Sequence, residues 1–328
     1  MKVMQVGLGP IGAAISRLLI RKPGWNIVAA VDTDPAKQGR DLGEIVGLEQ
    51  RLGIPVYGQL PAPHTHDVDI AFLTTVSTFP EVLPTLETLV RAGIDVVAST
   101  EELFFPYYRY AAQAMALDDL AKQHGVSILG TGINPGFIMD TLVLVLTSVC
   151  QQITRIAVTR IVNASGRRPS LQKKIGVGLT PEAFAEAAAQ HRVGLVGPVD
   201  SVAFLAHVLA WHMDDVRERF VPVIADKPFL QTQRRVEPGQ VCGIRHIVKG
   251  IAQGKEAISL DLRMYLEAEN PRDTIYIEGT PTLESTMKST DMEDVAAAGL
   301  LVNMSPIVRQ ARAGLLTMVD LPLPHFQR

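Results

Sequence analysis

The segment MKVMQVGLGPIG, residues 1–12, decides the fold, because a short apolar run ends directly in a G-x-G-x-x-G pattern. The helix-periodic sequence AAISRLLIRK follows without a break. A strand, a glycine-rich turn and a helix in this order form a cradle for the pyrophosphate of a dinucleotide. Gly7 permits the tight turn, Gly9 lets the main chain approach the pyrophosphate, and Gly12 lets the helix pack closely on the strand.

The next apolar run, NIVAAVD at 26–32, predicts a second buried strand that ends in Asp32. A carboxylate at this place accepts hydrogen bonds from the adenosine ribose of a dinucleotide. It favours NAD over NADP because it repels a 2′-phosphate at close range. Lys37 and Arg40 follow closely enough to reach such a phosphate, so we predict NAD or NADP, with NAD favoured. The alternative is a glycine-rich turn in another kind of α/β protein.

Three further apolar runs continue the alternation of strands and helices: DIAFLTT (69–75), DVVAST (95–100) and VSILGT (126–131). Continuous apolar runs are typical of parallel strands that are buried on both faces. We therefore predict an α/β fold with a Rossmann doubly wound parallel sheet, which binds its ligand beyond the carboxyl ends of the strands. The residues predicted to bind the cofactor are Gly7, Gly9, Pro10, Ile11, Gly12, Asp32, Thr33, Lys37, Thr75, Asn134 and Pro135.

The pattern changes after residue 140 to longer β-like runs, such as 153–164, 240–251, 256–269 and 273–281. They predict an α+β domain with a mixed sheet over 141–290 that binds substrate and forms a dimer. Its helix after Thr180 has a threonine N-cap followed by Pro181. The amphipathic segment 293–311 predicts that the chain returns, so residues 1–140 and about 291–328 would form the dinucleotide-binding domain.

The composition indicates small-molecule chemistry. A formal net charge of −3 and a pI near 6.3 offer no basic field for nucleic acid or for an anionic membrane surface. No apolar segment reaches the roughly 18 residues of a membrane span. Cys150 and Cys242 form no disulfide framework, and neither they nor the histidines show the spacing of a metal site. We expect a cytoplasmic protein without a metal.

Two adjacent carboxylates, Glu101 and Glu102, follow the strand 95–100 at the edge where nicotinamide and substrate would meet. A carboxylate there can act as a base or bind an ammonium ion, and burial would bring its pKa toward neutrality. The alternative is a pair of acids in the first turn of a helix, where the helix dipole favours them. Tyr107, Tyr108 and Tyr110 either line a pocket or fill an inter-domain seam. The histidines His207 and His212 read as packed or surface residues.

Several longer motifs carry a family resemblance: VGLGPIG, D-x-DPAK-x-G-x-DLGE at 32–44, STEELFFP, GTGINPGF-x-MDTL at 130–142, QKKIGVGLTPEAF at 172–184 and GLLTMVDLPLP near the end. The sequence resembles NAD(P)-dependent amine dehydrogenases related to 2,4-diaminopentanoate dehydrogenase, a group similar in fold to dihydrodipicolinate reductase. The resemblance implies reversible oxidative deamination of an amine, with reductive amination by ammonia as the reverse. It places the active-site glutamate on the pair Glu101 and Glu102 without deciding between them.

The segment GTGINPGF, residues 130–137, then has a predicted role in passing the main chain under the nicotinamide, with Asn134 and Pro135 fixing the turn. An inter-domain hinge is the other reading. Phe137, Tyr107 and Leu195 are the predicted substrate-binding residues. Leu195 stands where relatives tend to carry histidine, which favours small, rather apolar amines or ketones over 2,4-diaminopentanoate.

Two other functions remain open on the sequence alone. One is an imine reductase of the dihydrodipicolinate type, although the sequence has no HH-x-x-K-like run. The other is a dinucleotide-sensing protein without turnover, against which the two glutamates argue. A homodimer is expected, because the predicted second sheet has a face that no other segment clearly covers. The alternative is that this face packs on the helices of 181–213.

Overall fold

The computed structural model describes residues 1–60, 67–230, 235–288 and 292–327, and it divides the chain into two compact units. Unit 1 comprises Met1–Phe137 and Met292–Arg328, and unit 2 comprises Ile138–Asp291. The predicted domain boundary at 290/291 lies outside the described residues. Each unit has its own sheet and its own apolar core.

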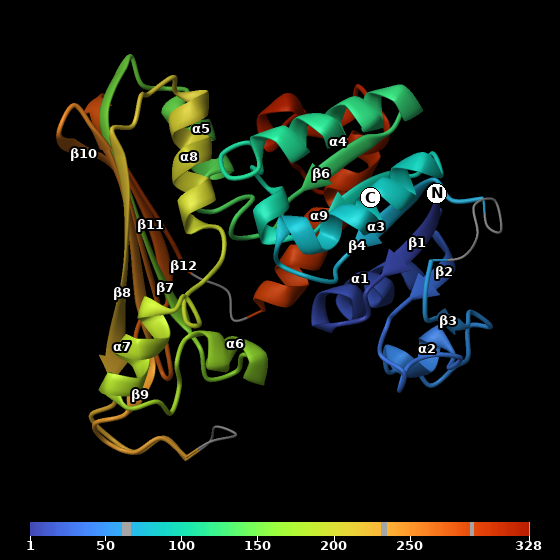
Figure 1. Cartoon of the computed structure of the whole chain (residues 1–328), viewed down its shortest axis with the longest axis horizontal. Coiled ribbons are helices and arrows are strands. Elements are labelled where there is room, and N and C mark those ends of the chain that lie inside the picture. Colours follow the sequence, from blue (N-terminus) through green and yellow to red (C-terminus); the bar gives the residue numbers. More distant parts are fainter. Residues whose placement is uncertain (61–66, 231–234, 289–291, 328) are drawn as a thin grey trace. The chain divides into compact units, whose positions relative to one another are not determined.

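Unit 1 contains a parallel sheet of the doubly wound type, so the fold prediction is confirmed (Figure 1). Its strands run in the spatial order β13, β6, β5, β4, β1, β2 and β3. Their bounds are β1 Lys2–Val6, β2 Asn26–Val31, β3 Val56–Tyr57, β4 Ile70–Leu73, β5 Asp95–Ala98, β6 Ser127–Gly130 and β13 Gly314–Leu316. All residues of β4, β5 and β6 are buried, which explains their continuous apolar runs.

Helices cover both faces of this sheet. Helix α1 (Pro10–Ile20) packs against α9 (Glu293–Arg309), and α3 (Phe79–Arg91) packs against α4 (Ala111–His124). Shorter helical segments complete the unit: α2 Leu42–Ile45, η1 Glu101–Leu103 and η2 Met318–Asp320. The C-terminal part of the chain contributes α9, which contacts β5 and β6, and β13, which pairs with β6. Arg309 anchors α9, because its guanidinium contacts the carboxylates of Asp95 at 2.8 Å and of Asp69 at 3.5 Å.

Unit 2 contains a mixed sheet in the order β12, β11, β7, β10, β9 and β8. Strands β7 and β10 are parallel and the other pairs are antiparallel. The bounds are β7 Gln152–Asn163, β8 Asp215–Ile224, β9 Val241–Ala252, β10 Lys255–Tyr265, β11 Arg272–Thr280 and β12 Leu283–Lys288. The sequence predicted β7, β9, β10 and β11, but it missed β8 and β12, whose residues are largely half-buried or exposed and carry few apolar side chains at regular spacing.

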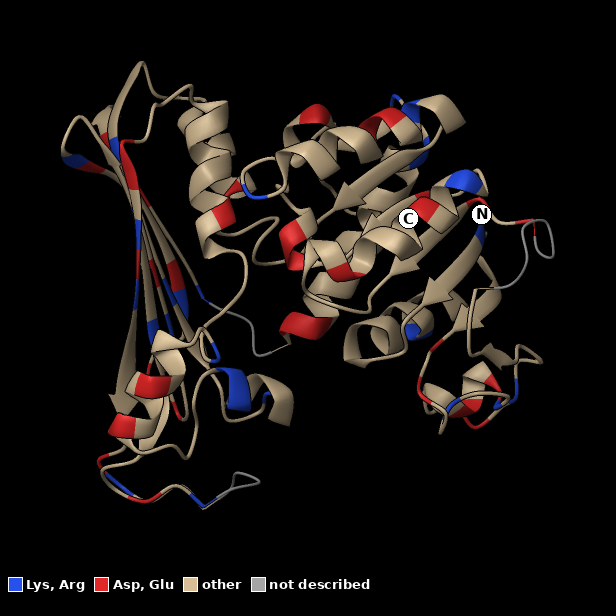
Figure 2. Cartoon of the chain, in the orientation of Figure 1, with Lys and Arg blue, Asp and Glu red and all other residues tan. Residues whose placement is uncertain are grey.

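The helices of unit 2 lie along one face of its sheet (Figure 1). They are α5 Thr141–Thr147, α6 Pro169–Lys174, α7 Pro181–Ala189 and α8 Pro198–Val208. The predicted N-cap of α7 is present, since the Thr180 hydroxyl accepts a hydrogen bond from the Ala183 N–H. Acidic and basic residues alternate along the strands (Figure 2), and Asp261 bridges Arg245 and Arg263 at 2.8 and 2.6 Å. No described helix covers the face that carries these charges.

Candidate functional site

The glycine-rich turn after β1 has the geometry that its sequence predicts. Gly7 adopts a φ of +88°, which an L-residue with a side chain rarely adopts. A Cβ atom on Gly12 would overlap the carbonyl oxygen of Gly7, so only glycine lets α1 pack this closely on the turn. A Cβ on Gly9 would meet no atom within 4 Å, so this side of the turn is open to a ligand. Gly9 caps α1 without a side-chain hydrogen bond, and Pro10 occupies its first turn.

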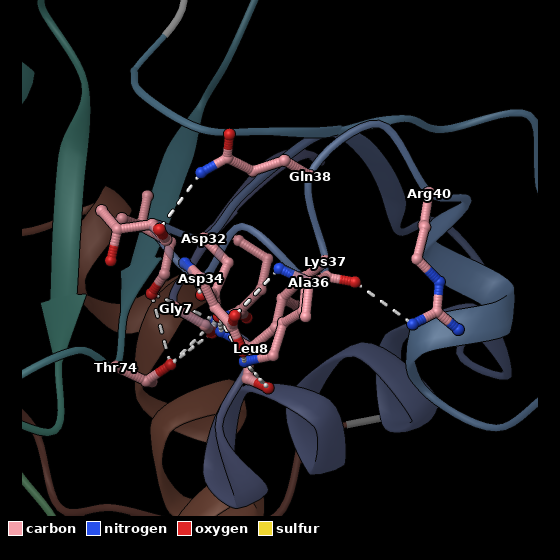
Figure 3. A network of polar contacts seen from close by, with 12 residues as sticks. Gly7, Leu8, Asp32, Asp34, Ala36, Lys37, Gln38, Arg40 and Thr74 are labelled. Atoms are coloured by element: carbon pink, nitrogen blue, oxygen red, sulfur yellow. Dashed lines mark hydrogen bonds and ion pairs between the residues drawn. The ribbon is translucent and has the colours of Figure 1, made fainter.

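Asp32, the residue after β2, lies beside the glycine-rich turn and contacts its backbone at Leu8 (Figure 3). Its Oδ2 accepts hydrogen bonds from the Leu8 N–H at 2.7 Å and from the Lys37 ammonium at 2.9 Å. Its Oδ1 accepts the Asp34 N–H at 2.9 Å. Burial would raise the pKa of Asp32, but the bonds from Lys37, Asp34 and Leu8 outweigh it and lower the pKa below its usual value. Asp32 is therefore ionised at neutral pH and fixed beside the glycine turn.

A buried amide supports this turn from below. Gln5 is fully buried in β1, and its Nε2 donates to the Gly7 carbonyl at 2.9 Å and to the Thr74 hydroxyl at 3.0 Å. The Thr74 hydroxyl in turn donates to the same Gly7 carbonyl at 2.8 Å. Thr75 was the residue predicted at this place, whereas Gln5 and Thr74 were not predicted from the sequence. A glutamine inside the apolar run VMQV was the available signal, since a buried amide needs hydrogen-bond partners.

The two adjacent glutamates have different surroundings. The Glu102 carboxylate accepts hydrogen bonds at one oxygen from the Phe79 N–H at 2.8 Å and from the Tyr110 hydroxyl at 2.9 Å. We call this arrangement the Glu102 bridge. It connects η1 to the first residue of α3 and to the residue that precedes α4. The Glu101 side chain is half-buried, and within the described ranges its carboxylate has no hydrogen bond or ion pair.

The loop after β6 contributes a second set of polar atoms in unit 1. Asn134 Oδ1 is buried and has no hydrogen-bond partner among the described residues, and the same holds for the Thr100 hydroxyl at the start of η1. Gly136, with a φ of +132°, packs against the backbone of Gly132, so the loop folds tightly on itself. A buried polar atom normally has a partner, so these two atoms fit the polar groups of a bound ligand. They are compatible with a nicotinamide dinucleotide.

The remaining predicted residues fall into different places. Thr33 and Thr75 are exposed, and Ile11 is half-buried in α1. The Tyr107 hydroxyl donates to the Leu315 carbonyl in β13 at 3.0 Å, and burial raises its pKa to about 12. This tyrosine therefore ties the segment after η1 to an edge strand of the sheet. Pro135 is buried beside Asn134, and Phe137 is half-buried at the end of the same loop.

Leu195 belongs to unit 2, where it packs against the apolar core. Its N–H lies 3.4 Å from Nδ1 of His246, a fully buried side chain whose Nε2 is 2.9 Å from Glu218. The histidine thus receives a hydrogen bond at one nitrogen and gives one at the other, which fixes its ring. The histidines flagged in the sequence, His207 and His212, are both exposed.

The described part of the chain contains no group of three or more histidine, cysteine or carboxylate side chains that could hold a metal ion. Both cysteines are free. In the same ranges, no helix is long and apolar enough to cross a membrane.

Comparison with known proteins identifies the family. Residues 137–327 match the C-terminal domain of 2,4-diaminopentanoate dehydrogenase, which is more than half of the chain. The chain belongs to the 2,4-diaminopentanoate dehydrogenase family. Residues 1–126 match the N-terminal domain of dihydrodipicolinate reductase, and this match lies within unit 1. Membership of this family confirms the predicted relation to amine dehydrogenases and the prediction of an oxidoreductase that acts on CH–NH2 donors.

Two relatives and one solved structure align with nearly the whole chain. The 2,4-diaminopentanoate dehydrogenase of Acetoanaerobium sticklandii is 28% identical, with 98% of this chain and 94% of the relative covered. An amine dehydrogenase of Streptomyces virginiae is 23% identical, with 97% and 95% covered. The structure of an amine dehydrogenase from Mycobacterium smegmatis superposes with a TM-score of 0.89 at 22% identity, over 100% of this chain and 97% of that one. That last likeness shows a shared fold.

Proposed function

We propose that the chain catalyses the reversible NAD(P)-dependent oxidative deamination of an amine, whose reverse is the reductive amination of a small ketone or aldehyde with ammonia. The observation that carries the proposal is the contrast between the glutamates: Glu102 is held in the Glu102 bridge, while the Glu101 carboxylate stays available at the carboxyl end of β5. The relatives named amine dehydrogenase and 2,4-diaminopentanoate dehydrogenase support the same reaction class.

Glu101 is the proposed proton-transfer group. In the deamination direction its carboxylate would take a proton from the substrate ammonium, which frees the nitrogen lone pair to form the imine as the hydride leaves carbon. In the amination direction the same carboxyl would protonate the hydroxyl of the carbinolamine, which leaves as water. After it regains a proton from solvent, it would protonate the amine nitrogen. A bound nicotinamide dinucleotide supplies the hydride acceptor or donor.

The residues that would hold this dinucleotide come from three places in unit 1. Gly7, Gly9 and Gly12 form the turn for the pyrophosphate, supported by Gln5 and Thr74. Asp32 would accept hydrogen bonds from the adenosine ribose, which favours NAD. Asn134 and Thr100 are proposed for the nicotinamide end, because each has a buried polar atom that lacks a partner within the described ranges. Pro10, Ile11, Thr33, Thr75 and Pro135 remain predicted contacts.

We propose the roles of the two units accordingly: unit 1 binds the dinucleotide, and unit 2 binds substrate and forms a homodimer. The uncovered face of the unit 2 sheet supports the dimer. Its Arg245–Asp261–Arg263 cluster carries both positive and negative charges, which can form ion pairs with a second copy. Phe137, Tyr107 and Leu195 remain the predicted substrate contacts. The apolar character of Leu195 still favours small, apolar carbonyl compounds. The cytoplasm is the proposed compartment, because both cysteines are unpaired.

The test is the oxidation of NADH and NADPH with a panel of simple ketones and aldehydes, with and without ammonium at mildly alkaline pH. We expect oxidation that depends on both carbonyl compound and ammonium. Glu101→Gln should reduce kcat about 100- to 10,000-fold while dinucleotide binding persists. Oxidation that ignores ammonium, or a Glu101→Gln variant with normal kcat, would refute the proposal. Turnover with diamino acids alone would refute the preference for apolar substrates.

A further inference from the structure

The loop that follows β2 carries two cations and several carboxylates, and only one of the cations lies at Asp32. Lys37 Nζ contacts Asp32 Oδ2 at 2.9 Å and the Leu8 carbonyl at 3.3 Å (Figure 3). The side chains of Asp32 and Lys37 are 10% and 24% exposed, so the pair is largely shielded from water and from salt. Lys37 therefore bears directly on the charge that a ligand meets at the end of β2.

Arg40 is engaged elsewhere. Its guanidinium binds Glu44 at 2.7 and 3.2 Å and the Ala36 carbonyl at 3.3 Å, and in Figure 3 it extends away from Asp32. An approaching phosphate would have to compete with Glu44 for this side chain. Arg40 is therefore the weaker of the two candidates for an anion contact, although it is the closer match to the arginine that often serves in NADP-binding sites.

The Asp32–Lys37 ion pair weakens the ability of Asp32 to exclude the 2′-phosphate of NADP. A lone carboxylate here would repel the two negative charges of a 2′-phosphate at short range. Lys37 offsets that repulsion because its positive charge lies within hydrogen-bond distance of the same oxygen. An ammonium group carries three N–H donors, and two of them find acceptors at Asp32 and Leu8. The third is available for a phosphate oxygen, since Asp34 Oδ2 lies 3.8 Å away, beyond hydrogen-bond distance.

We infer that Lys37 is the residue that determines cofactor selectivity in this chain: it admits the 2′-phosphate of NADP, while Asp32 binds the ribose hydroxyls of NAD. The chain would then use both dinucleotides, in contrast to a site with the carboxylate alone. The inference rests on the proposed function, because it requires that unit 1 binds a nicotinamide dinucleotide.

Dinucleotide binding by the full-length protein is the direct test, because it reports affinity without turnover. We would measure the Kd values of NADH and NADPH by fluorescence titration for the wild type, Lys37→Gln and Lys37→Arg. Loss of one charge-assisted hydrogen bond should weaken NADPH binding about 10- to 100-fold in Lys37→Gln. The Kd of NADH should change by less than about threefold, and Lys37→Arg should retain NADPH binding. Asp32→Asn should change the ratio in the opposite direction, because it weakens NADH and spares NADPH.

Arg40→Gln is the matched control, since it removes a cation from the same loop, and we expect it to leave the ratio of the two Kd values unchanged. Loss of NADPH affinity in Arg40→Gln instead of Lys37→Gln would overturn the inference. Equal weakening of both dinucleotides by Lys37→Gln would also overturn it, because Lys37 would then only support the loop. A wild type that binds NADH but not NADPH refutes the inference alone, whereas binding of neither refutes the proposed function with it.

Discussion

The Glu102 bridge leads to different predictions for the two neighbouring glutamates: replacing Glu102 should lower the stability of the protein, whereas replacing Glu101 should lower its turnover. Glu102→Ala removes both hydrogen bonds and leaves the Phe79 N–H, on a fully buried residue, without its acceptor. Hydrogen bonds to a charged acceptor contribute about 1.5–3 kcal/mol each, but neighbouring losses are not additive, so we expect a total of about 2–4 kcal/mol. At about 2–4 °C per kcal/mol for a domain of this size, the melting temperature should fall by about 5–15 °C.

Thermal unfolding followed by circular dichroism, together with turnover, checks this prediction. Tyr110→Phe removes only one of the two bonds and should cost about 1 kcal/mol. Glu101→Ala is the matched control, and its unfolding free energy should stay within about 0.5 kcal/mol of the wild type while its turnover is lost. The reasoning is refuted if Glu101→Ala destabilises the protein as much as Glu102→Ala does. It is also refuted if Glu102→Ala unfolds at the wild-type temperature.

Three further predictions concern unit 1. Gly12→Ala should abolish measurable dinucleotide binding and lower the melting temperature, because its Cβ would overlap the Gly7 carbonyl; a titration with NADH and a thermal melt check both. Asp41 accepts hydrogen bonds from three backbone N–H groups, which lower its pKa below the usual 3.8, so its stabilising effect is complete above that pH and is lost as the pH falls toward the lower folded-state pKa. Urea unfolding should therefore show Asp41→Asn less stable than the wild type at pH 7, with the difference shrinking below about pH 4. Arg309→Met should destabilise the protein by about 1–2 kcal/mol in the same assay, because it leaves the buried Asp95 without its cation, and an unchanged midpoint would show that α9 is held by apolar packing alone.

Local rules allowed the sequence to predict much of unit 1. The run before Gly7 and the run that ends at Asp32 follow the spacing that a pyrophosphate and a ribose impose on any strand–turn–helix unit. Strands buried on both faces are apolar throughout, so β4, β5 and β6 were recognisable from composition alone. Unit 2 was harder to predict, because its strands have one charged face and its edge strand β12 alternates half-buried and exposed residues.

Long-range contacts could not be predicted in the same way. Gln5 and Thr74 are 69 residues apart, and their hydrogen bond exists only because β1 and β4 pair side by side. The Tyr107 hydroxyl donates to a carbonyl 208 residues away, in a strand that the sequence did not reveal. A pattern along the chain can indicate that a polar group is buried, but the identity of its partner depends on the order of strands in the sheet.

The sequence motif alone does not distinguish Glu101 from Glu102, whereas the folded structure gives the two side chains different surroundings. Both residues lie in the same short helical turn, and both carry the same chemical group. The turn places the Glu102 carboxylate at the first N–H of α3, which donates a hydrogen bond to it. This N–H has no partner within the helix, so the carboxylate supplies its acceptor. The two hydrogen bonds of Glu102 connect η1 to α3 and to the residue before α4, so its carboxylate is engaged in holding these segments together. The Glu101 carboxylate has no such bonds among the described residues, and this contrast is why we propose Glu101, and not Glu102, for proton transfer.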